Sequence, residues 1–430
     1  MPAAIAISSD LRPAVLGGPP AVTFDQTEAL RWPIIGPEDE AAVLRVVRSG
    51  QISISDETAA LEEDYKKWLG VKHAVAHCNG TSAIHAALHA FDIGPGDEVI
   101  VPSATWWASV MPVLHLGGIP VFAETENECI GLDPADVEKK ITPRTKAIVV
   151  VHLFGMPSKM NELIALAKKH NLRILEDASH AHGATYHGKP VGTLTDAAVF
   201  SMQANKLVPS AEGGMFLTND QEMWEKVIRF GHYERLLTLQ SPNKRFAATG
   251  FGYKFRMSPL SAAVARVQLK RLADRNRVRN DNCIYLSRRL EEISQGAIQT
   301  FLAPPNVERV YFEFLVRVDE SRTGVPLRDM ARALQAEGAQ VGAPRYPLLH
   351  QQPMFTDPSA PWARLARISA ESGRALPIYD PGALPRTASG NASLLKLPSF
   401  PRAERRLLDQ YAKAFEKVLS HAQELPRETK

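Results

Sequence analysis

Residues 173–220 read RILEDASHAHGATYHGKPVGTLTDAAVFSMQANKLVPSAEGGMFLTND, a stretch in which an acid and a lysine follow two short apolar runs. The first run, Ile174-Leu175, ends in Glu176-Asp177. The second run, residues 197–202, leads to the lone lysine Lys206. Short apolar runs bounded by turn-forming residues are typical of buried strands. We therefore expect a carboxylate at the end of one strand and an amine just past another.

This pairing is what pyridoxal 5'-phosphate chemistry requires. A lysine holds the aldehyde of this cofactor as a Schiff base, and a carboxylate keeps the pyridine nitrogen protonated, so that the ring accepts electrons. Each residue alone has a simpler interpretation, because a loop lysine is usually solvated and an acid after a strand often caps the next helix. The ordered combination favours Lys206 and Asp177 as catalytic residues that bind pyridoxal 5'-phosphate.

Strand and helix patterns alternate through the first two thirds of the chain. This order predicts an α/β fold with a mainly parallel, seven-stranded sheet in a large domain, followed by a smaller C-terminal α/β domain. We expect a flexible tail over residues 1–25, a large cofactor-binding domain over 26–270 and a small domain over 271–430. The predicted strands are 73–77, 98–102, 120–123, 147–152, 173–176, 197–202 and 215–218, and the helices between them include 81–91, 104–116 and 160–169.

Three segments, EDASHAHG at 176–183, FSMQANK at 200–206 and EGG at 212–214, resemble the DegT/DnrJ/EryC1/StrS family of sugar and cyclitol aminotransferases. The likeness runs from about Leu30 to about Leu419 and implies fold type I of the pyridoxal phosphate enzymes. The family also contains dehydratases that remove a hydroxyl from pyridoxamine-loaded sites and have histidine in place of this lysine. Lys206 therefore favours transamination.

The segment Asn79-Gly80-Thr81-Ser82 follows a predicted strand and opens a helix. Backbone N–H groups at a helix N-terminus suit an anion, although the same residues would serve as an ordinary helix cap. The resemblance implies that the Gly-Thr turn and Ser201 bind the cofactor phosphate. We therefore take Gly80, Thr81, Ser82 and Ser201 as cofactor-binding candidates.

Two more candidates come from aromatic positions. Trp106 follows a predicted strand, where an aromatic residue is usually part of the core but can also stack on a pyridine ring. The resemblance implies stacking for Trp106, and we expect Trp107 to pack inward. It also implies that His180 lies near the phenolic oxygen of the cofactor; the alternative is a loop histidine with its hydrogen bonds satisfied within the protein.

Lys254 departs from the family pattern. It stands in Gly252-Tyr253-Lys254-Phe255 where the family usually has an asparagine that reaches the cofactor phosphate of the neighbouring subunit. A lysine can serve the same anion as a point charge. This assignment implies a homodimer with shared active sites, whereas the alternative is a surface lysine.

The overall composition agrees with a cytoplasmic enzyme that acts on small molecules. A formal net charge of +3 over 430 residues gives no reason to expect a nucleic-acid partner, and no apolar stretch approaches a membrane span. The three cysteines lack metal-binding spacing, which indicates reduced thiols and no metal site.

The sequence thus predicts an aminotransferase that uses an amino donor, glutamine or glutamate, and a keto-sugar or ketocyclitol acceptor of secondary metabolism, as in aminosugar or aminocyclitol antibiotic pathways. The alternative is a dehydratase or aromatising enzyme like 3-amino-5-hydroxybenzoate synthase, whose elimination would use the same lysine. A sensor without catalysis on this fold is a third class, which nothing in the sequence supports.

Overall fold

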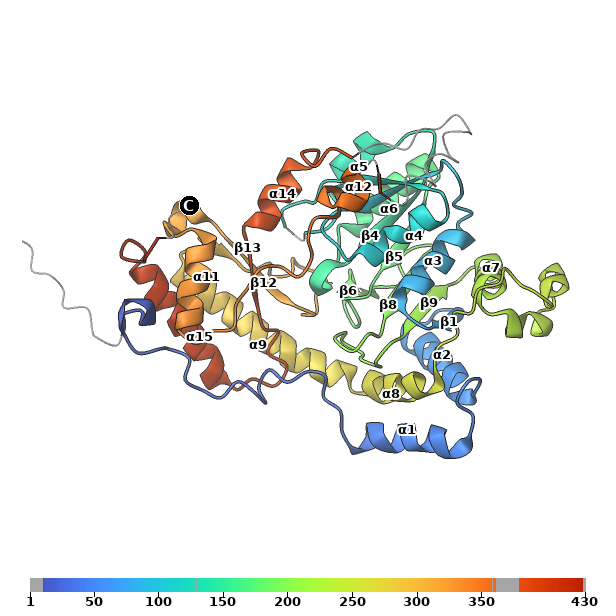
Figure 1. Ribbon diagram of the computed structural model, residues 1–430, viewed down its shortest axis with the longest axis horizontal. Coiled ribbons are helices and arrows are strands. Elements are labelled where there is room, and N and C mark those ends of the chain that lie inside the picture. The colour runs from blue at the N-terminus through green and yellow to red at the C-terminus, as the bar shows by residue number, and fades with distance from the viewer. Residues whose placement is uncertain (1–10, 129, 358, 361–378, 428–430) are drawn as a thin grey trace, which may run out of the picture.

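The computed structural model describes residues 11–128, 130–357, 359–360 and 379–427 (Figure 1). Its centre is a seven-stranded sheet in the order β1-β9-β8-β5-β4-β2-β3. Strands β3, β2, β4, β5 and β8 run parallel, while β9 is antiparallel to both of its neighbours. The predicted fold class is thereby confirmed. The strand bounds are β1 (His73–His77), β2 (Glu98–Pro102), β3 (Ile119–Ala123), β4 (Thr145–Val151), β5 (Arg173–Asp177), β8 (Ala197–Ser201) and β9 (Gly214–Thr218).

Helices cover both faces of this sheet because alternate strand residues point to opposite sides. Val149 of β4 packs in a core with α3 (Gly80–Ala90) and α4 (Met111–His115). Its neighbours Ile148 and Val150 pack on the other face with α5 (Pro134–Lys140) and α6 (Met160–His170). Near-continuous apolar strands are the sequence signature of a sheet that is buried on both faces.

Residues 104–116 differ from the single helix that the sequence predicts. They form a short 3-10 helix, η3 (Trp107–Ser109), and then α4, with Pro112 in its first turn. A proline has no N–H to donate and clashes with the preceding turn, so it is tolerated only at a helix start. The break leaves the segment before α4 as an irregular loop at the end of β2.

A long helical segment connects the sheet to the C-terminal part of the chain (Figure 1). It consists of α8 (Pro259–Lys270) and α9 (Leu272–Ile293), which meet at Arg271. A second core forms around α9 and a small antiparallel sheet of order β10-β12-β13. It contains β10 (Ile298–Gln299), β12 (Phe314–Val318), β13 (Leu394–Leu397), α11 (Leu327–Ala336) and α15 (Arg405–Ser420).

Three further helices pack around these elements. Helix α1 packs on α8, α2 packs on β1 and α8, and α7 packs on α3. Near α6, three short strands form a separate antiparallel sheet of order β11-β6-β7. The bounds are α1 (Pro37–Ser49), α2 (Asp56–Leu69), α7 (Gln221–Gly231), β6 (Thr185–Tyr186), β7 (Lys189–Pro190) and β11 (Val307–Glu308).

The N-terminal segment differs from the flexible tail predicted over residues 1–25. Residues 1–10 lie outside the described residues, but residues 11–25 pack against α11 and α15 and contribute Ala21 and Val22 to the second core. The buried carboxylate of Glu337 accepts the N–H groups of Ala14 and Ala21, and Lys417 Nζ donates to Glu337 at 2.6 Å. A buried ion pair with its hydrogen bonds satisfied holds this segment in place.

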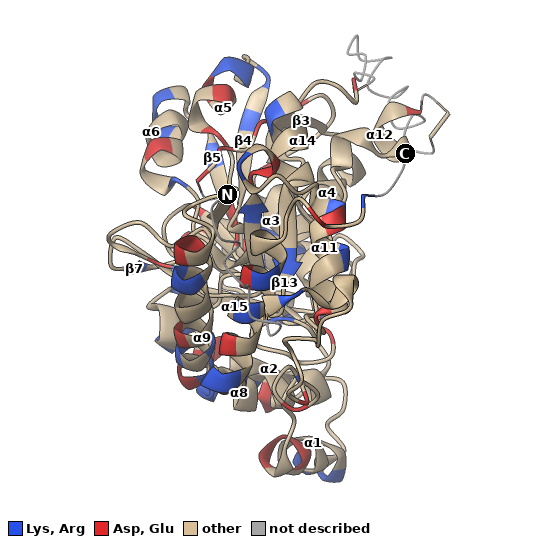
Figure 2. Cartoon of the chain, turned by 90° about the vertical axis from the view of Figure 1, so that its left-hand side faces the viewer, with Lys and Arg blue, Asp and Glu red and all other residues tan. Residues whose placement is uncertain are grey.

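Charge and hydropathy add two observations. On the face shown in Figure 2, Lys and Arg are interspersed with Asp and Glu along α8 and α9. Among the described helices, none combines the length and the apolar character needed to cross a membrane.

Candidate active site

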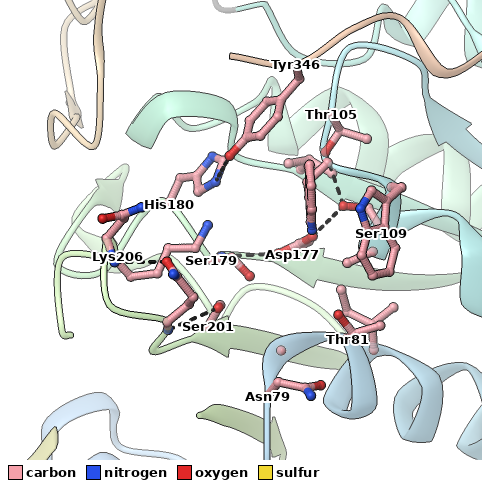
Figure 3. Close-up of a pocket in the computed structure, with 18 of the residues that line it drawn as sticks. Asn79, Thr81, Thr105, Ser109, Asp177, Ser179, His180, Ser201, Lys206 and Tyr346 are labelled. Atoms are coloured by element: carbon pink, nitrogen blue, oxygen red, sulfur yellow. Dashed lines mark hydrogen bonds between the residues drawn. The ribbon is translucent and has the colours of Figure 1, made fainter. Parts of the chain in front are cut away.

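A cavity of about 550 Å³ lies at the carboxyl ends of the parallel strands. In an open α/β sheet this edge is where ligands bind, because the loops that follow neighbouring strands converge there. Most of the predicted residues lie together in this cavity (Figure 3). The predicted residues that line it are Gly80, Thr81, Trp106, Asp177, His180, Ser201 and Lys206; Ser82 and Lys254 do not.

Asp177 ends β5 with its carboxylate in the cavity, and it is 4% exposed. Its Oδ2 accepts the Ser109 hydroxyl at 2.7 Å, and its Oδ1 accepts the N–H of Ser179 at 3.2 Å. The neighbouring Glu176 points to the other face of the strand, where it accepts the N–H groups of Gly192 and Leu194. Of the acidic pair, Asp177 alone therefore faces the cavity.

Lys206 stands on the loop after β8, with its side chain in the same cavity (Figure 3). Its Nζ lies 4.6 Å from the ring centroid of Phe312. Burial lowers the pKa of Lys206 to about 8, although the negative charge of Asp177 acts in the opposite direction. The loop itself is held from outside, since Trp32 Nε1 donates to the Lys206 carbonyl at 3.2 Å. A larger fraction of this amine is therefore uncharged, and nucleophilic, at neutral pH than in a free lysine.

The N-terminus of α3 forms a cradle beside Ser201. The first-turn N–H groups of a helix have no intrahelical acceptors, and among the described residues the one cap in this turn is Asn79 Oδ1, which accepts the Ser82 N–H at 2.8 Å. The glycines allow close approach: a Cβ at Gly80 would lie 2.9 Å from Ser201 Cβ, and one at Gly214 would lie 2.8 Å from Gly80 N. The backbone N–H groups, the positive end of the helix dipole and the hydroxyls of Thr81 and Ser201 thus suit an anion.

The structure places Ser82 outside the cavity, contrary to the prediction that it binds the cofactor. Its hydroxyl donates to the Asn79 carbonyl at 2.8 Å, and its N–H donates to the Asn79 side chain. Ser82 therefore completes the cap of α3 instead of lining the cavity.

The two tryptophans both line the cavity. Trp106 is 44% exposed, as expected for a ring that can cover a ligand, but Trp107 is 41% exposed and does not pack inward. The prediction for Trp107 is wrong because the loop breaks into η3 at this residue, so that both rings lie outside the sheet.

His180 is held between two neighbours. Its Nδ1 accepts the N–H of Phe154 at 3.3 Å, and its Nε2 lies 3.1 Å from the Tyr346 hydroxyl. Burial, with the nearby positive charge of Lys206, keeps the pKa of His180 well below its usual value. A neutral ring whose Nδ1 accepts carries its proton on Nε2, so His180 donates to Tyr346. The Tyr346 hydroxyl is then free to donate into the cavity.

Lys254 lies away from this cavity. Its side chain is exposed, and its Nζ is 5.8 Å from the ring centroid of Tyr233. The surrounding loop also exposes apolar side chains, with Phe251 59% and Tyr253 41% exposed. Within a single chain, Lys254 therefore contacts no other residue of the candidate site.

Several residues of the site were missed by the sequence reasoning, among them Ser179 and Tyr346, which are described above. Ser109 binds Asp177, Phe312 lies against Lys206, and Arg345 lines the cavity while pairing with Glu313. Ser109 had a signal, because it stands four residues after Thr105, whose hydroxyl it contacts at 3.1 Å. Phe312 and Arg345 lie more than a hundred residues further along the chain than Lys206 and had no local signal.

Comparison with known proteins identifies the family of the chain. Residues 33–381 match the DegT/DnrJ/EryC1/StrS aminotransferase family. The chain belongs to this family. It is 36% identical to the GDP-perosamine synthase of Caulobacter vibrioides over 74% of this chain and 84% of that protein. It is 33% identical to a putative L-glutamine:3-amino-2,3-dideoxy-scyllo-inosose aminotransferase of Micromonospora echinospora, over 81% and 83%. The crystal structure of an aminotransferase from Psychrobacter cryohalolentis superimposes with a TM-score of 0.80 at 27% identity, covering 91% and 99%.

As a member of the DegT/DnrJ/EryC1/StrS family, the protein is an aminotransferase that depends on pyridoxal 5'-phosphate. The residues present fit that cofactor. One cavity holds an amine with a lowered pKa, a buried carboxylate, and a glycine cradle whose N–H groups suit a phosphate.

Proposed function

We propose that the protein transfers an amino group from glutamine or glutamate to a keto-sugar or ketocyclitol in secondary metabolism, and that it works in the cytoplasm. The relatives support this substrate class, since one is named for a GDP-linked aminosugar and another for an aminocyclitol with L-glutamine as donor. The unpaired thiols of Cys78 and Cys283 are typical of reducing compartments.

The observation that carries the proposal is the placement of Lys206 and Asp177 in one cavity. When bound, pyridoxal 5'-phosphate supplies an electron sink that stabilises negative charge at the donor's Cα. In this proposal Lys206 Nζ would hold the cofactor through its aldehyde, and the same amine, when free and uncharged, would accept the proton from the donor's Cα. Asp177 keeps a proton on the pyridine nitrogen, and Ser109 and Ser179 orient its two carboxylate oxygens.

The remaining residues bind and orient. We assign the N–H groups of Gly80 and Thr81, with the Ser201 hydroxyl, to the phosphate, and the exposed ring of Trp106 to one face of the pyridine. The buried pair His180 and Tyr346 presents a hydroxyl donor on the side of the cavity formed by the second domain. Such a donor suits the phenolic oxygen of the cofactor or an oxygen of the substrate.

We further propose a homodimer in which Lys254 reaches the cofactor phosphate of the partner subunit. Two observations support it: Lys254 is exposed and remote from its own cavity, and it stands on a loop with exposed apolar side chains at Phe251 and Tyr253. Exposed apolar patches of this kind mark interaction surfaces.

The test is a titration of the purified holoenzyme with candidate amino donors, followed by mass spectrometry of the product. A transaminase loses its visible absorbance when glutamine or glutamate is added, regains it with a keto acceptor, and yields an aminated product with the hydroxyl groups of the acceptor retained. A dehydratase or aromatising enzyme yields a product that has lost water. Absence of any spectral change with both donors would overturn the proposed donor.

A further inference from the structure

A second cavity, of about 750 Å³, adjoins the active site. It lies between the N-terminal segment, the Lys206 loop and the small domain, and it shares Asn205, Phe312 and Arg345 with the catalytic cavity. Its charged lining residues are Arg279, Arg345 and Lys396 against one acid, Glu313. Because Glu313 already pairs with Arg345, two positive charges remain without a carboxylate partner within 4 Å in the part of the chain that the structure describes.

Arg279 is the unusual member of this set. It is only 2% exposed, and its Nε and Nη1 are buried without any hydrogen-bond partner among the described residues. Burial lowers the pKa of Arg279 to about 10, which still leaves the guanidinium charged at neutral pH. A buried charge without a partner is costly, and such groups are normally paired.

The stacking of Trp32 explains how this guanidinium is presented. The Arg279 Cζ lies 4.0 Å from the ring centroid of Trp32, so the tryptophan covers one face of the guanidinium plane. The N–H donors of arginine lie in that plane and point outward from its edge, where their fork matches two oxygens of a carboxylate or phosphate. Lys396 of β13 lines the same cavity and adds a second cation.

We propose that this second cavity is an oxyanion-binding subsite of the enzyme, in which Arg279 and Lys396 hold a carboxylate or phosphate group of a substrate whose reacting end lies near Lys206. This inference rests on the proposed function in one respect: the group that occupies the subsite is taken to belong to the amino donor or to the keto acceptor. The two sources share one chemistry: the donor offers a carboxylate, and an acceptor can carry a phosphate group.

The first experiment measures binding of inorganic phosphate and of malonate to the holoenzyme by calorimetry at constant ionic strength. The variant Arg279→Gln removes the charge, and Lys396→Gln removes the second cation from a side chain that is already partly exposed. Arg277→Gln, on the exposed face of the same helix α9, is the matched control. We expect Arg279→Gln to weaken binding of at least one probe roughly 10- to 100-fold, Lys396→Gln to weaken it less, and Arg277→Gln to leave it unchanged.

Two further measurements identify the source of the oxyanion. If the donor's carboxylate occupies the subsite, Arg279→Gln raises the donor concentration needed for half-maximal loss of absorbance and leaves the limiting rate in place. If an acceptor phosphate occupies it, the donor half-reaction is unaffected, and inorganic phosphate competes with the acceptor in the wild type but not in the variant. Should Arg279→Gln fail to fold, Lys396→Gln still tests the cavity.

Equal affinity of both probes for the wild type, Arg279→Gln and Lys396→Gln would overturn the subsite. So would binding that is lost equally in Arg277→Gln. In either case a normal spectral change with glutamine or glutamate would leave the proposed function standing, so the two failures are distinguishable.

Discussion

The lowered pKa of Lys206 makes a quantitative prediction for how the apoprotein captures its cofactor. Only the uncharged amine attacks an aldehyde, and burial moves the pKa of Lys206 from 10.5 to about 8. At pH 7 roughly a tenth of such an amine is uncharged, against about 0.03% of a lysine in water, a ratio of about 300. We therefore expect the capture rate to rise with pH and to level off above about pH 8.

The assay is stopped-flow absorbance after mixing apoprotein with pyridoxal 5'-phosphate at a series of pH values. Nα-acetyl-lysine, measured in parallel, corrects for the ionisation of the cofactor itself. Asp177→Asn provides a second arm: its carboxylate raises the pKa of Lys206, so its removal should shift the corrected midpoint to lower pH. A corrected midpoint near 10.5, or a shift to higher pH in Asp177→Asn, would refute the reasoning.

Three other predictions concern single side chains. Lys206→Ala should lose both the visible band, at roughly 400–430 nm, and the bond that borohydride fixes; a reducible bond in the variant would exclude the assignment. Asp177→Asn should raise the barrier of the donor half-reaction by about 3–5 kcal/mol. Ser109→Ala, which removes a hydrogen bond to a charged group, should raise it by about 1.5–3 kcal/mol. Single-turnover absorbance measures both rates, and near-wild-type rates would contradict the two predictions. Mixed dimers of Lys206→Ala and Lys254→Glu subunits should regain part of the activity, because one of their two sites has both native residues; verified mixed dimers without activity would count against the shared site.

The sheet was predictable because its strands carry their own signals. Residues 98–102 and 197–202 are short apolar runs with clear ends, and the order of strand and helix patterns leaves few topologies open. The same locality placed Asp177 and Lys206 at strand ends, and the structure brings both into one cavity.

What the sequence left undetermined depends on contacts between distant segments. Arg279 lies on α9 and Lys396 on β13, and only the packing of these elements brings both to one cavity. The prediction that Trp107 packs inward was wrong because Pro112 breaks the predicted helix. One residue thereby changes the conformation of the five residues before it. Whether Lys254 serves a partner is a property of an assembly and has no expression in a single chain.

The N-terminal segment bears on the order in which the chain can fold. Ala14 is 323 residues from Glu337, and Pro19, whose carbonyl accepts from Lys417 Nζ, is 398 residues from that lysine. This segment therefore docks on surfaces that are synthesised long after it. Contacts of such high sequence separation form late, because the entropy of closing the long loop is lost before they add stability. Trp32 continues this segment to the Lys206 carbonyl and stacks on Arg279 of α9, so the Lys206 loop acquires this outer support only after α9, which follows it in the chain, has joined the fold.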